Sequence, residues 1–221
     1  MIPSISIGNL PQLTIDLLIH SLSFEKIGYF NCRYIYPFIS PQDHKIGDDK
    51  PGISQGLEVF YSQEHKITVI QQRAPVITNF LSNYLQEIIN PFIQLGRFEK
   101  IYLLDSNDAG LLENHDDPHR IDLLKAEEIL SKSLQNLNLS FGNEDLIKFS
   151  KFTTELCQNS NLLVIVSYIY EGDNFFDAEL QGQKLLNLLN IKNCTWTRPM
   201  SWLGVYGDKQ VSNAMEDGLY G

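Results

Sequence analysis

Residues 162–174, LLVIVSYIYEGDN, decide the fold class of this chain. β-branched and aromatic residues dominate positions 162–170, which is typical of a β-strand, and a polar turn follows. After that turn the apolar residues recur at the spacing of an amphipathic helix. A strand that leads directly into a helix is the repeating unit of α/β folds. The buried face of this helix is predicted to carry Phe175, Ala178, Gly182, Leu185 and Leu189.

The turn between this strand and helix allows two interpretations. Open α/β sheets often bind ligands just beyond the carboxyl ends of their strands, which favours a binding site at Glu171. In the structural interpretation, Gly172 permits a tight turn and Asp173 or Asn174 caps the helix. Asp177 would then stabilise the positive N-terminal end of the helix. Taken alone, the segment favours the structural interpretation.

The N-terminal third of the chain predicts strands and one helix. We expect a strand at residues 2–7 and a mostly apolar helix at 10–22, with Asn9 as a cap and Pro11 in the first turn. A second strand at 26–30 precedes a loop at 41–56 that is rich in Pro, Gly and Asp. The sequence then predicts a β-hairpin, whose strands are residues 57–61 and 66–72.

The middle of the chain is less regular. A helix is predicted at residues 76–95, which Pro91 must kink or end, and a strand at 100–104. We expect a polar loop from Ser106 to Arg120, and then helices near 122–137 and 146–156. The sequence therefore predicts one α/β domain with a mixed sheet, helices on both faces and one β-hairpin. This domain is expected to cover residues 1–206, and a C-terminal tail residues 207–221.

The composition restricts the function classes. The chain has 221 residues, 43% of them apolar, which suffices for a single domain with a sizeable core. Its net charge of −10 argues against a general affinity for nucleic acid or anionic membrane, because both need basic surfaces. The 3 cysteines are odd in number and widely spaced, which favours reduced thiols. With neither a secretory signal nor an apolar run of ~20 residues, we expect a soluble cytoplasmic protein, with the nucleus as a second location.

Motifs for catalysis and metal binding match poorly. Residues 47–52 have the outer glycine spacing of a phosphate-binding loop, but Ile53 and Ser54 replace its Lys-Ser/Thr pair. Residues 115–119, HDDPH, offer two imidazoles and two carboxylates that could bind a metal ion. However, no third or fourth ligand lies at a sequence spacing that is characteristic of a metal site. There is no Gly-x-Ser-x-Gly elbow for a nucleophilic serine. We therefore predict no catalytic residue, no metal and no cofactor, and interpret Trp202 as a packing or interface residue.

The chain ends in Leu219-Tyr220-Gly221 after the polar stretch 207–218. Such an end can fill a pocket on another protein: the ring supplies contact area, and the terminal carboxylate can pair with a lysine. A frayed terminus without a role is the default alternative. An apolar-Tyr-any ending is expected in roughly one chain in a hundred, so the tripeptide needs support from elsewhere.

Several segments together resemble the proteasome assembly chaperone 2 family, close to its fungal members. The resemblance rests on residues 3–13 (PSISIGNLPQL) with 16–18, 57–61 (LEVFY), 71–75 (QQRAP), 171–174 (EGDN) with 177–178, and 198–202 (RPMSW) with 204 and 206–207. These segments keep the family's order and span most of the chain, whereas residues 106–160 match little. The family-motif residues are assigned a structural or interface role: Gly8, Asn9, Glu171, Gly172, Asp173, Asn174, Asp177, Arg198, Pro199, Ser201 and Trp202.

The resemblance implies a non-enzymatic chaperone with a fold related to phosphorylase-like domains. It implies a heterodimer with proteasome assembly chaperone 1 that caps the outer face of the α-ring of immature core particles. By the same resemblance, Leu219, Tyr220 and Gly221 insert between proteasome α-subunits and block premature docking of regulatory particles.

Two rival hypotheses remain. One is an enzyme of the phosphorylase or hydrolase type, with Gly8, Asn9, Glu171 and Asp173 around a small-molecule pocket. The other is a scaffolding module unconnected with proteasomes, whose tail binds a different carboxylate-reading domain.

Overall fold

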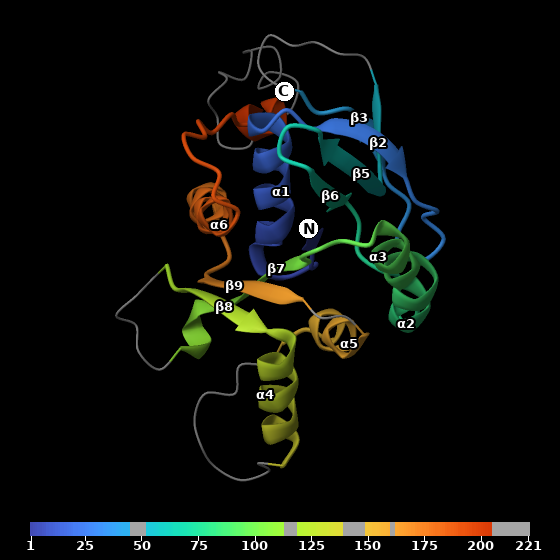
Figure 1. Ribbon diagram of the computed structural model, residues 1–221, viewed down its shortest axis with the longest axis vertical. Helices are drawn as coiled ribbons and strands as arrows, with labels where there is room; N and C mark the ends of the chain where they lie inside the picture. Colours follow the sequence, from blue (N-terminus) through green and yellow to red (C-terminus); the bar gives the residue numbers. More distant parts are fainter. Residues whose placement is uncertain (45–51, 113–118, 139–148, 160–161, 205–221) are drawn as a thin grey trace, which may run out of the picture.

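The computed structural model describes residues 1–44, 52–112, 119–138, 149–159 and 162–204 (Figure 1). The tail predicted at 207–221 lies outside these residues, as do residues 47–51 of the candidate phosphate loop and 115–118 of the candidate metal motif. Within the described residues, every helix is too short or too polar to cross a lipid bilayer.

A mixed four-stranded sheet forms the centre of the fold, in the order β1-β7-β9-β8. β9 pairs in parallel with β7 and antiparallel with β8, and β1 pairs in parallel with β7. The predicted mixed sheet is thus confirmed. Its strands are β1 (Ile2–Pro3), β7 (Tyr102–Asp108), β8 (Ile121–Lys125) and β9 (Leu163–Ile169).

Helices cover both faces of this sheet, as predicted (Figure 1). On one face Ile165 of β9 packs against α1 (Leu10–Ser21) and α6 (Phe175–Leu188). On the other face Val164, Val166 and Tyr168 join the apolar cluster that contains the remaining helices. Each fully buried side chain of this kind contributes about 1.5–3 kcal/mol. The helices of the second face are α2 (Leu81–Tyr84), the π-helical η2 (Leu85–Ile89), α3 (Asn90–Gly96), α4 (Ala126–Asn138) and α5 (Lys151–Asn159).

Two smaller antiparallel sheets lie beside the central one. The predicted hairpin is present and β2 completes its sheet, in the order β2-β5-β6. The second small sheet is a hairpin of β3 and β4, inside the region predicted as a loop. In the described part of the chain, three 3-10 helices complete the fold. The elements are β2 (Glu25–Tyr29), β5 (Leu57–Ser62), β6 (Ile67–Gln72), β3 (Ile39–Pro41), β4 (Ile53–Gln55), η1 (Ile7–Asn9), η3 (Ala109–Leu111) and η4 (Met200–Gly204).

Several predicted boundaries were wrong. The helix expected at 76–95 begins only at Leu81, and it continues past Pro91, where the preceding π-helical turn alters the hydrogen-bonding pattern. The helix expected at 122–137 was wrong at its start, because Ile121–Lys125 forms the edge strand β8. β7 extends through Asp108 into the segment expected to be a loop, since its polar end pairs with β9.

A buried carboxylate joins β7 to α5 and to the residue that follows β1. Asp105 of β7 is 1% exposed, and its side chain accepts hydrogen bonds from Ser4 Oγ (2.5 Å) and Thr153 Oγ1 (2.6 Å). The backbone N–H of Ser106 donates a third bond at 2.9 Å. Burial raises the pKa of Asp105 above its ordinary value of 3.8, although these hydrogen bonds act in the opposite direction.

The raised pKa predicts how stability depends on pH. Because the folded state holds the Asp105 proton more tightly than the unfolded state, the free energy of unfolding should fall as pH rises from about 3.8 through the raised pKa. This single group contributes a slope of up to about 1.4 kcal/mol per pH unit. Asp105→Asn should remove that slope in a series of urea denaturation curves. The control Asp108→Asn alters an exposed carboxylate on the same strand, and equal pH profiles for the two variants would contradict the assignment.

Candidate functional site

A cleft of about 530 Å³ opens beyond the carboxyl ends of β1 and β9. It brings together family-motif residues from three separate segments of the chain. Phe38, Phe175 and Trp202 give the cleft an aromatic wall, and Gln12, Asp16 and Arg73 supply polar groups. Five of the predicted motif residues line the cleft: Asn9, Gly172, Asn174, Ser201 and Trp202.

Gly8, which precedes the cleft residue Asn9, packs closely against Asn174. Gly8 has a φ of 65°, in the left-handed region that favours glycine, and Asn9 follows at 49°. A Cβ atom on Gly8 would lie 2.3 Å from Asn174 Nδ2 and 2.8 Å from Ile169 Cδ1. The close approach explains why a glycine stands here. Asn9 occupies the predicted cap position of α1, but its side chain makes no capping hydrogen bond.

The acidic residues of the turn at 171–174 act on local structure. Asp173 Oδ1 accepts a hydrogen bond from Phe175 N at 3.1 Å, so Asp173, and not Asn174, caps α6. Asp177, in the first turn of α6, lies 3.0 Å from Nδ1 of His119. Glu171 and Asp173 are exposed and neither lines the cleft.

The segment 198–204 is fixed against the domain by packing and hydrogen bonds. The Trp202 ring, 6% exposed, stacks on Phe175 with centroids 4.3 Å apart and planes 10° apart. Arg198 Nη2 pairs with Glu179 Oε1 at 2.9 Å, and Pro199 is buried. The predicted packing role of Trp202 fits this geometry. Gly204 is the last described residue before the tail, so Leu219, Tyr220 and Gly221 lie outside the described residues.

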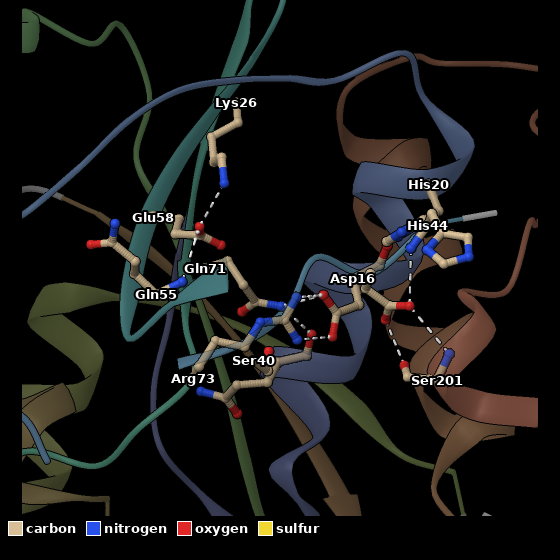
Figure 2. Close-up of polar contacts among 12 residues, drawn as sticks. Asp16, His20, Lys26, Ser40, His44, Gln55, Glu58, Gln71, Arg73 and Ser201 are labelled. Carbon is tan, nitrogen blue, oxygen red and sulfur yellow. Dashed lines mark hydrogen bonds and ion pairs between the residues drawn. The ribbon is translucent and has the colours of Figure 1, made fainter. Parts of the chain in front are cut away.

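A buried ion pair forms one wall of the cleft. Asp16 of α1 accepts hydrogen bonds from Arg73 Nη1 (2.7 Å) and Nη2 (2.6 Å), and from Gln71 Nε2 (2.7 Å). Figure 2 shows both donors directed at the Asp16 carboxylate. Burial, the largest single influence, lowers the pKa of Arg73, but the charges of Asp16, Asp43 and Glu58 and the hydrogen bonds to Asp16 together outweigh it, so the pKa is raised. Motif analysis of the sequence missed this pair; the signal was a charged residue inside the apolar stretch of helix 10–22.

The lining of the cleft contains no cysteine, and the three cysteines of the chain lie elsewhere. Burial raises the pKa of Cys157 to about 12 and also raises those of Cys32 and Cys194, so these thiols stay protonated at neutral pH. The described residues hold no group of three or more His, Cys, Asp or Glu side chains that could bind a metal ion. The cleft offers aromatic and amide surface, which suits the binding of apolar or uncharged groups.

Comparisons with known proteins agree on one family. The chain matches the PAC2 family over residues 1–166. It is 28% identical to "Proteasome assembly chaperone 2" of Saccharomyces cerevisiae, over 94% of each chain. It is also 28% identical to the protein of the same name from Nematostella vectensis, over 87% of this chain and 89% of that one.

A solved structure supports the fold. PbaA of Pyrococcus furiosus, described as an archaeal homolog of proteasome-assembly chaperone, superposes with a TM-score of 0.61 and 14% sequence identity. The match covers 87% of this chain and 81% of PbaA. At 14% identity, this structural similarity supports a shared fold and does not support a shared function.

Gly8→Ala tests the close approach of Gly8 to Asn174 and Ile169. The substitution should lower the free energy of unfolding by about 1–3 kcal/mol, because it combines left-handed strain with overpacking against Asn174 and Ile169. Gly28→Ala is the matched control, since a Cβ there meets nothing within 4 Å. If urea denaturation shows the same decrease in the free energy of unfolding for both variants, the packing argument is contradicted.

Arg73→Met tests the buried ion pair. It should cost about 3 kcal/mol of stability, because Asp16 would remain buried without its countercharge. Arg198→Met removes the pair of Arg198 with Glu179 on an exposed surface, and should cost less than about 1 kcal/mol. If thermal and urea unfolding show the same loss of stability for Arg73→Met and Arg198→Met, the buried ion pair does not stabilise the fold as proposed.

Proposed function

This chain belongs to the PAC2 family, and we propose that it is a proteasome assembly chaperone that acts by binding rather than by catalysis. The observation that carries this proposal is the alignment with "Proteasome assembly chaperone 2" of Saccharomyces cerevisiae along 94% of both chains. The protonated cysteines support a role without nucleophilic chemistry.

In this proposal the chain pairs with proteasome assembly chaperone 1 and binds the outer face of the α-ring of immature core particles. Leu219, Tyr220 and Gly221 fill a pocket between α-subunits. An occupied pocket is closed to regulatory particles that use similar tails, so premature docking is blocked. The acidic chain, with a net charge of −10, suits a pocket that offers lysine to the terminal carboxylate.

The fixed segment 198–204 supports this role for the tail. Trp202 and Ser201 hold this segment against the domain, so the chain is fixed up to the residues that precede the tail. A short tail alone makes a small contact and binds weakly. A second contact by the body or by a partner chaperone raises the overall affinity through effective concentration.

An enzyme of the phosphorylase or hydrolase type is the second candidate, which the 530 Å³ cleft favours. The exposed positions of Glu171 and Asp173, away from the cleft lining, weigh against it.

The tail proposal predicts a strict dependence on the position of the terminal carboxylate. Deleting Leu219 to Gly221 should weaken binding to purified immature core particles roughly tenfold or more. One residue added after Gly221 should be nearly as damaging as deleting Tyr220, because it displaces the carboxylate.

Gly221→Ala is the matched control, since it keeps both the chain length and the carboxylate. It should bind like the unaltered chain. Unchanged affinity of the truncated chain in surface plasmon resonance would refute the anchor role.

A further inference from the structure

The β3–β4 hairpin carries its apolar residues outward and its serines inward. Register pairs Ser40 with Ser54 and Pro41 with Ile53, so Ile39, Pro41 and Ile53 share the opposite face from the serines. Ser54 is 3% exposed, whereas Ile39 is 76% and Ile53 54% exposed. A half-buried hairpin normally shows the reverse pattern, with apolar side chains toward the core. This inversion marks an interaction surface.

The hairpin is firmly attached to the domain. Lys26 Nζ donates to the backbone oxygen of Ile53 at 2.8 Å and to Glu58 Oε1 at 3.0 Å. Glu58 has a side chain that is 1% exposed, and its Oε1 also accepts from Gln55 N at 3.1 Å. Figure 2 shows Lys26, Gln55 and Glu58 converging at this point. The apolar face is therefore held in a fixed orientation.

The same hairpin adjoins the start of the tail. Asp43, two residues after β3, accepts hydrogen bonds from Ser201 Oγ (2.5 Å) and Ser201 N (3.2 Å). The backbone oxygen of His44 accepts from Met200 N at 2.8 Å. In Figure 1, β3 and the red η4 segment lie at the same end of the molecule. A random coil as long as residues 205–221 spans roughly 23 Å, so a partner that takes the tail end lies within reach of the hairpin.

We propose that Ile39 and Ile53 form the body contact with the same partner that receives the tail, the outer face of the proteasome α-ring. This inference rests on the proposed function. The hydrogen bonds from residues 200–201 to residues 43–44 place this hairpin beside the segment that precedes the tail. This placement favours the partner of the tail as the protein that contacts Ile39 and Ile53. A second copy of the chain is disfavoured, because two chains that each carry a net charge of −10 would repel each other. Two contacts on one partner act together through effective concentration.

The test compares Ile39→Asp combined with Ile53→Asp against Leu95→Asp. Leu95 is the matched control, because it is 83% exposed on α3. Both variants should keep the melting temperature of the unaltered chain, since the substituted side chains are exposed. The hairpin variant should bind immature core particles about tenfold more weakly, and the Leu95 variant should bind normally. Combining the hairpin substitutions with deletion of Leu219 to Gly221 should abolish binding.

The outcomes separate this inference from the proposed function. Unchanged binding of the hairpin variant, with strong binding of the unaltered chain, overturns the hairpin assignment alone. A hairpin variant that loses only the second chaperone subunit also overturns it, because the surface then serves a different partner. An unaltered chain that does not bind immature core particles overturns both.

Discussion

The ion pair between Asp16 and Arg73 links the helix that covers the central sheet to the end of the three-stranded sheet. Asp16 lies on α1, which packs on the central sheet, and Arg73 directly follows β6 of the three-stranded sheet. Taking two charges out of water costs several kcal/mol per ion, so such a pair persists only with well-formed hydrogen bonds. The two guanidinium bonds and the amide of Gln71 meet that requirement. The cleft beside the pair is lined by residues of α1 on one side and by the end of β6 and the residues after it on another.

The other features of the site follow from this arrangement. With α1 fixed, Gly8 meets Asn174 where β9 ends, and α6 begins there. The ring of Phe175, at the start of α6, stacks on the ring of Trp202. This stacking fixes the segment before the tail. A chaperone that binds by a short terminal anchor needs such rigidity, because a defined starting point limits the entropy lost when the anchor binds. In the proposed function, the family-motif residues therefore act mainly by positioning the segment that precedes the tail.

The sequence predicted the strongly apolar elements well and the polar ones poorly. Residues 162–170 were correctly predicted as a strand, because β-branched residues leave little alternative to β structure, and β9 covers Leu163–Ile169. β8 and the β3–β4 hairpin were missed, since pairing partners far along the chain, and not local preference, hold them extended. The cleft was recognised only as separate motifs, because no local pattern reveals that residues 8–9, 172–174 and 201–202 meet. The ion pair joins residues 57 positions apart, beyond the reach of periodicity.

The central claim is that this chain assembles with proteasome subunits. The most direct measurement is purification of the tagged full-length chain from its own cells, followed by mass spectrometry of the bound proteins. The account predicts proteasome α-subunits together with a second α/β chaperone, in stoichiometric amounts. Recovery of the chain without α-subunits and without that second chaperone would contradict it.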